Sequence, residues 1–124
     1  MCNISSDYEG VLREGLLPRR ARAEQTLAEG RGDKDFLEAA IETIDAVIAF
    51  ADRYAEALPD GEGLKDAMRH GAKDFLNALR MLRMLHLALW ASNVYHNTVG
   101  RFDQYMWPYL KADLDRGMSR DEAL

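Results

Sequence analysis

The stretch that decides the fold is "DFLEAAIETIDAVIAFADRYAEAL", which runs from Asp35 to Leu58. Because an α-helix turns once in about 3.6 residues, apolar residues at alternating spacings of four and three lie on one side of it. Asp33 precedes the stretch as an N-cap residue, whose carboxylate can accept a hydrogen bond from a free backbone N–H group. The sequence therefore predicts a helix with an apolar seam, formed by Leu37, Ile41, Ile44, Ile48, Ala51, Ala55 and Leu58.

The segments on either side of this helix also indicate helices. Ser6 and Glu9 have the spacing of a capping box and predict a helix start, while Pro18 predicts a break or kink further along. A third helix is expected to rise somewhere after Leu64 and to include Phe75 to Trp90. Polar residues recur only every third position in that run, so much of its circumference is apolar. No segment alternates with the period of two that is typical of strands.

The expected fold is therefore all-α, with about four helices packed as an irregular bundle. With 124 residues and 48% hydrophobic composition, the chain forms a single helical domain over residues 1–124. The seam and the run from Phe75 to Trp90 are the two longest apolar stripes in a chain with one core. We therefore expect them to pack against each other, with Ile44 in the core.

Composition excludes several classes of partner. The formal charge of -5 argues against nucleic acid, and the short basic cluster from Arg19 to Arg22 does not overturn this. Cys2 is the only cysteine, so one chain can build neither a disulfide framework nor a thiolate metal site. The N-terminus lacks the pattern of a signal peptide, and the most apolar segment, Phe75 to Trp90, contains Arg80, Arg83 and His86. We expect a cytoplasmic protein without a membrane span.

Residues that could carry chemistry are sparse. His70, His86 and His96 do not have the i, i+4 spacing that places two imidazoles on one metal, so no metal site is predicted. His86 lies in an apolar run and is interpreted as a hydrogen-bonded core histidine, because no orienting carboxylate is nearby. Met81 and Met84 are interpreted as core filler at their spacing. No catalytic residue and no cofactor are predicted.

The segment "TVGRFDQYMWPYLKADLDRGMSRDEAL", Thr98 to Leu124, is more specific. Its oppositely charged Arg101 and Asp103 stand among aromatic residues, a setting that favours a buried or partly buried structural pair. From Gly100 to Leu124 the chain resembles the glycyl radical enzymes, the family of pyruvate formate-lyase and its diol dehydratase and decarboxylase relatives. The resemblance implies structural roles for Gly100, Arg101, Asp103, Gln104 and Tyr105.

Three upstream blocks are similar to the same family and follow in its order. They are "DYEGVLREGL" from Asp7, the stretch from Asp35 to Leu58, and "FLNALRMLRMLHLALW" from Phe75. The chain departs from the family pattern at Pro18, Trp90 and Asn77, the last of which replaces a glutamate of the family. It is also shorter than the family between Leu58 and Phe75.

The family's reaction needs a glycyl radical in a C-terminal loop and a cysteine in a Cys-x-Glu motif, and neither motif occurs in this sequence. The ten-stranded β/α barrel of the family is lacking as well. The resemblance therefore implies a truncated or degenerate segment that is not catalytic by itself. If another chain completed a substrate cavity, His96 and Phe102 would face it; the alternative is that His96 is a surface loop residue.

Two functional classes stay open at this point. The chain is either an incomplete piece of a glycyl radical lyase or dehydratase, or a stand-alone helical module that self-associates. The expected partner is accordingly a second glycyl radical enzyme chain or another copy of this chain. Near the C-terminus, Gly117 predicts a helix stop, and Ser119 with Glu122 has capping-box spacing. Too few residues follow Ser119 for more than one frayed turn.

Overall fold

The computed structural model describes residues 4–91 and 96–123. These ranges contain six helices and two strands of two residues each, so the all-α class is confirmed while the helix number exceeds the expected four. In chain order the elements are β1 (Ile4–Ser5), α1 (Tyr8–Glu14), α2 (Leu17–Ala28), α3 (Lys34–Ala55), α4 (Glu62–His70), α5 (Phe75–Ala91), β2 (Asn97–Thr98) and α6 (Phe102–Asp115).

Two of the expected helices are each interrupted once, and these interruptions explain the additional helices. Pro18 lies in the first turn of α2, so the expected kink is a full break between α1 and α2. Gly71 ends α4 with a φ of 97° and separates it from α5, whereas the sequence predicted a single helix that starts after Leu64 and includes Phe75 to Trp90. The start of α1 also differs: Asp7, rather than Ser6, is the N-cap, and its carboxylate accepts a hydrogen bond from Gly10 N. The predicted N-cap of α3 is confirmed, because Asp33 accepts from Phe36 N at 2.9 Å.

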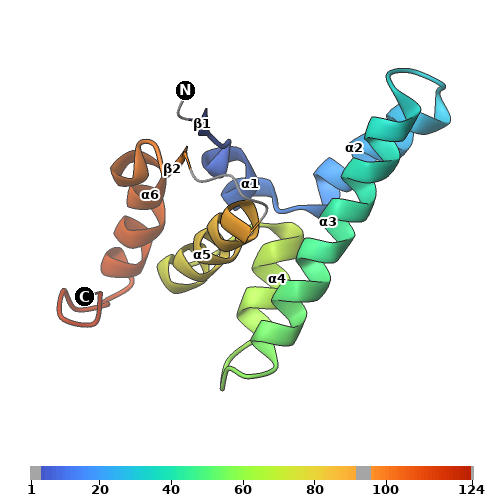
Figure 1. The fold of residues 1–124 in the computed structure, drawn as a ribbon. Coiled ribbons are helices and arrows are strands. Elements are labelled where there is room, and N and C mark those ends of the chain that lie inside the picture. The colour runs from blue at the N-terminus through green and yellow to red at the C-terminus, as the bar shows by residue number, and fades with distance from the viewer. Residues whose placement is uncertain (1–3, 92–95, 124) are drawn as a thin grey trace.

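Figure 1 shows α2 and α3 running side by side as a long hairpin, with α4 beside the second half of α3 and α6 on the opposite side of α5. The core lies where α1, α4 and α5 meet. Its largest fully buried side chains are Leu12, Leu64, Met68 and Met81. Met84 is also buried, at 3% exposure, so both methionines of α5 are core filler as predicted.

The C-terminal ends of α1 and α4 cross at a close backbone contact. Leu16 N donates to Met68 O at 2.9 Å, and Ala72 N donates to Leu12 O at 2.8 Å. Both helices end in a glycine with positive φ, Gly15 at 77° and Gly71 at 97°. A Cβ on either glycine would lie 2.3 Å from a carbonyl oxygen of the other segment. The crossing therefore requires glycine at both positions.

The seam of α3 packs against different neighbours than expected. It contacts α2 and α4 along most of its length and α5 only over a short stretch. Ile48, Ala51 and Ala55 are buried, whereas Ile44 is half-buried. The prediction that the seam packs mainly on α5 is therefore wrong. The main neighbours of α3 are α2 and α4, because α4 occupies the space beside the second half of α3.

Because Ile48 is buried and Ile44 is half-buried, we expect their replacement by alanine to destabilise the protein to different extents. Replacing Ile48 by alanine should lower the free energy of unfolding by about 2 to 5 kcal/mol, the range for a buried side chain. Replacing Ile44 by alanine should cost less than about 2 kcal/mol, since part of its surface already meets water. Urea titrations of both variants measure the two losses. Equal losses would contradict the observed burial.

Beyond α6 the chain forms a single turn. Gly117 has a φ of 103° and follows the last turn of the helix, as its stop signal predicts. Ser119 N donates to Glu122 Oε2 at 2.7 Å, and Glu122 N donates to Ser119 Oγ at 3.2 Å, so the capping box forms. Among the described residues, no helix is long and apolar enough to cross a membrane.

Candidate functional site

The junction between β2 and α6 contains the residues that the sequence singled out. β2 pairs in parallel with β1, with Ile4 opposite Asn97 and Ser5 opposite Thr98. Gly100 follows with a φ of 61°, and a Cβ there would lie 2.6 Å from Ser5 Oγ. Glycine at this position therefore permits both the left-handed turn and the close approach of the N-terminal segment.

Tyr105 anchors the start of α6 below this turn. Its side chain is buried, and its hydroxyl donates to Val99 O at 2.6 Å. Burial, with a smaller contribution from Tyr8, raises the pKa of Tyr105 to about 12, so the hydroxyl keeps its proton at neutral pH. The Tyr105 ring also contacts Phe102, at 6.0 Å between centroids, and Tyr8, at 6.2 Å. These contacts fix the β2–α6 turn against α1.

A polar network joins the same junction to α1 and α5. Asn97 Nδ2 donates to Tyr8 Oη at 2.8 Å, and Tyr8 Oη lies 3.2 Å from His86 Nδ1. Ser6 Oγ extends the network towards Asn97 Oδ1 at 3.4 Å. The Tyr8 oxygen accepts the hydrogen bond from the Asn97 amide. The phenol proton of Tyr8 is therefore free to be donated to the imidazole nitrogen of His86. The predicted hydrogen bond of His86 is confirmed, but the residue is half-buried rather than in the core, and within the described chain no carboxylate bonds to its ring.

The charge pair that leads into α6 lies at the surface of this chain. Arg101 and Asp103 form two hydrogen bonds, at 3.1 and 2.9 Å, and each side chain is 68% exposed. Arg101 holds the pKa of Asp103 below its usual value through these bonds. The expected burial of this pair is therefore wrong for the chain by itself. Gln104, next along α6, is exposed as well.

The side chains of His96 and Phe102 both face solvent, and they do not line a common cavity. His96 is exposed in the turn before β2, and Phe102 is 38% exposed at the first turn of α6. The described residues therefore do not enclose a cavity between these two side chains. They also contain no group of three or more His, Cys, Asp or Glu residues placed to hold a metal ion. Cys2 falls outside the described residues.

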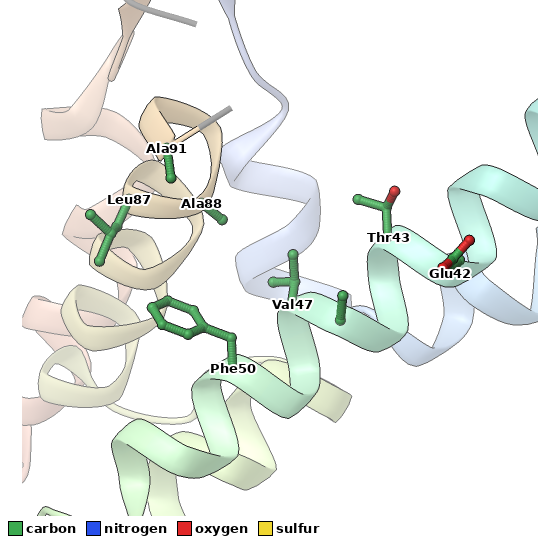
Figure 2. A pocket seen from close by; sticks show the side chains of 8 residues that line it. Glu42, Thr43, Val47, Phe50, Leu87, Ala88 and Ala91 are labelled. Carbon is green, nitrogen blue, oxygen red and sulfur yellow. The ribbon is translucent and has the colours of Figure 1, made fainter. Parts of the chain in front are cut away.

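A groove that the sequence interpretation missed runs between α3 and α5. Cavities of about 450 and 290 Å³ are lined by residues of both helices. A third cavity of about 360 Å³, lined by α3 and the turn after it, shares Phe50 with the first and Tyr54 and Leu58 with the second. Figure 2 shows Phe50 and Val47 on α3 facing Leu87 and Ala88 on α5. We call this the α3–α5 groove. Its lining on α3 repeats at spacings of four and three beside the seam, and that second stripe is the signal that could have identified it: Thr43, Val47, Phe50 and Tyr54.

Comparison with curated proteins identifies two similar lyases. The isethionate sulfite-lyase of Bilophila wadsworthia is 27% identical over 143 residues, which cover 94% of this chain and 17% of that protein. The isethionate sulfite-lyase of Oleidesulfovibrio alaskensis is 24% identical, with the same coverage of each chain. This chain therefore spans about a sixth of the length of the curated relatives it matches.

Two solved structures share the fold. The glycerol-bound form of the B12-independent glycerol dehydratase from Clostridium butyricum superposes with a TM-score of 0.70 at 23% identity, over 97% of this chain and 18% of that one. A structure describing 1,2-propanediol dehydration in Roseburia inulinivorans gives the same score and identity, over 98% of this chain and 18% of that one. Residues 62–124, half of the sequence, match the family model "Pyruvate formate lyase-like". The chain therefore belongs to the pyruvate formate lyase-like family, that is, to the glycyl radical enzymes.

Proposed function

We propose that this chain is a helical segment of a glycyl radical enzyme that does not catalyse radical chemistry by itself. The observation that carries the proposal is the combination of family membership with a sequence whose only cysteine, Cys2, stands in no Cys-x-Glu motif. The chain also corresponds to about a sixth of its curated relatives. Without a cysteine to form the thiyl radical and without a glycine loop to store one, hydrogen abstraction has no starting point.

The proposal names a class of enzyme and no substrate. Two similar proteins are isethionate sulfite-lyases, whereas one structure of the same fold is a glycerol dehydratase. Within this class we assign His96 and Phe102 to the wall of a substrate cavity that a second glycyl radical enzyme chain would complete. Their exposure beside the β2–α6 junction supports the assignment, because both side chains are available to such a partner. A cytoplasmic location is part of this proposal.

Electron paramagnetic resonance tests the absence of radical chemistry. The purified chain, kept anaerobic and supplied with a radical-generating activase, should give no glycyl radical signal and no lyase, dehydratase or decarboxylase turnover. The Bilophila wadsworthia isethionate sulfite-lyase, treated in parallel, is the control for a working activase. A protein glycyl radical on this chain would refute the proposal.

A second candidate function is a helical module that associates with itself. The observation in its favour is the open α3–α5 groove, because an apolar depression of this length in contact with water favours association. A discrete homo-oligomer, produced in cells without a neighbouring gene for the missing motifs, would favour this candidate. A neighbouring gene that encodes both motifs would favour the first.

A further inference from the structure

A cavity lies where α1, α2, α3 and α5 come together. Its volume is about 350 Å³, at the lower end of the range of about 300 to 1,000 Å³ that small-molecule sites occupy. Val47 and Ala88 line both this cavity and the α3–α5 groove, so they stand between the two spaces. We call it the four-helix cavity. Because four helices contribute to its lining, they would contact a small molecule inside it from several sides.

The lining is apolar along most of the cavity. Leu16 is buried there, whereas the other large apolar side chains are half-buried. The incomplete burial of Ile44 follows from this position, because its side chain lines the cavity. A ligand with an apolar body would remove these side chains from water, which is favourable. The apolar side chains come from all four helices or the residues next to them: Val11, Leu16, Ile44, Val47, Leu85 and Leu89.

One edge of the cavity is polar and carries an ion pair. Asp7, the N-cap of α1, and Arg19 of α2 both line the cavity, and Arg19 Nη2 lies 2.5 Å from Asp7 Oδ2. Two hydrogen bonds to Asp7 are described, from Arg19 and from Gly10 N, whereas a carboxylate can accept about four. Arg19 Nε is enclosed and makes no hydrogen bond within the described residues, although Glu14 Oε1 lies 3.0 Å away. The edge therefore has both acceptor and donor capacity left for a ligand.

The charges at this edge already balance one another. Arg19 pairs with Asp7 and Glu14, and Glu14 also pairs with Arg22 at 2.8 Å. A ligand carboxylate would be repelled by Asp7 and Glu14, and a ligand ammonium would be repelled by Arg19 and Arg22. A hydroxyl group has one donor and two acceptor lone pairs, so it can donate to Asp7 and accept from Arg19 while the ion pair stays intact. The edge is thus complementary to a neutral hydroxyl group.

We propose that the four-helix cavity binds a small neutral molecule with an apolar body and a hydroxyl at one end, of the class of the aliphatic alcohols. The body lies against Val11, Ile44 and Leu85, and the hydroxyl lies between Asp7 and Arg19. The inference goes beyond both candidate functions, since binding by this chain requires neither radical chemistry nor a second chain.

Titration of the full chain with 1-hexanol, followed through the amide chemical shifts in NMR spectra, tests the site. The shifts should saturate. Val11→Phe and Ile44→Phe, which fill the cavity from α1 and from α3, should each raise the Kd at least about tenfold, because the apolar body loses its space. Ala46→Phe adds the same ring at an exposed position that lines the α3–α5 groove but not the cavity, so this matched control should leave the Kd unchanged.

Two charged analogues of the ligand test the polar edge. Hexanoate and hexylammonium keep the apolar chain of 1-hexanol and replace its hydroxyl with a charge. Each should bind at least about tenfold more weakly, because either ion meets like charges at the edge. Equal or tighter binding of one of the two ions would overturn the assignment of the hydroxyl to Asp7 and Arg19.

Two further outcomes would overturn the site itself. Shifts that stay linear in 1-hexanol up to its solubility limit would show that no defined site exists. Saturable binding that Val11→Phe and Ile44→Phe both leave unchanged would place the ligand outside the cavity. Circular dichroism of each variant verifies that the helices are intact, and if one of the two filling variants loses its helices, the other decides.

Discussion

Replacing Gly71 by alanine should lower the free energy of unfolding by more than about 3 kcal/mol, because two separate costs act at this position. The backbone has a φ of 97° and a ψ of 154°, a conformation that essentially only glycine adopts. In addition, the new Cβ would lie 2.3 Å from Arg13 O, and this backbone oxygen cannot move away as a flexible side chain could. The α1–α4 crossing would have to open.

Opening the crossing would also remove two backbone hydrogen bonds, from Leu16 N to Met68 O and from Ala72 N to Leu12 O. Thermal and urea unfolding followed by circular dichroism measure the loss. Gly117→Ala is the matched control, since Gly117 has a φ of 103° but nothing within 4 Å of a new Cβ. It should cost only about 1 to 2 kcal/mol for the backbone conformation. Equal losses for the two variants would show that the close contact is unimportant.

The helices could be predicted from sequence because their signals are local. Asp33 is the N-cap of α3, and Gly117 follows the end of α6, both as expected. Pro18 lies at the start of α2, where the expected first helix is interrupted. Gly71 was missed because a single glycine, here in the largely polar stretch from Arg69 to Asp74, is compatible with a continuing helix. Only the α1–α4 crossing explains why the chain turns there, and this contact joins residues that are far apart in sequence.

The neighbours of the α3 seam could not be predicted for the same reason, because they too depend on contacts between residues far apart in sequence. Apolar stripes indicate which side of a helix is buried, but they do not identify the neighbour, and α4 was not expected as a separate element. The residues of "GRFDQY" could be identified from sequence, and Tyr105 is buried there. The pair Arg101–Asp103 is exposed instead, because none of the residues that the structure describes covers it. The second apolar stripe of α3 was visible in the sequence, yet its exposure could be recognised only once α5 was placed.

A buried carboxylate, Asp113, links α6 to the start of α5. Asp113 is 5% exposed, its Oδ2 accepts from Phe75 N at 2.8 Å, and its other oxygen pairs with Arg116. Phe75 N is one of the backbone donors that a helix leaves unsatisfied at its N-terminus, and the helix dipole favours a negative charge there. Asp74 Oδ1 accepts from Asn77 N, two residues further along the first turn, at 2.8 Å. The two carboxylates thus satisfy two of the free backbone donors at the start of α5.

Replacing Asp113 by alanine should therefore lower the free energy of unfolding by about 2 to 3 kcal/mol, because a buried backbone donor loses its charged acceptor. Asp113→Asn keeps an acceptor oxygen without the charge and should lose less. Asp115→Ala is the control two residues away, where an exposed pair with Lys111 contributes little to stability. If chemical unfolding gave equally small losses for D113A and D115A, Asp113 would be a bystander. A selective loss for D113A would mean that α6 holds the α5 N-terminus, and with it the wall of the groove, through one carboxylate.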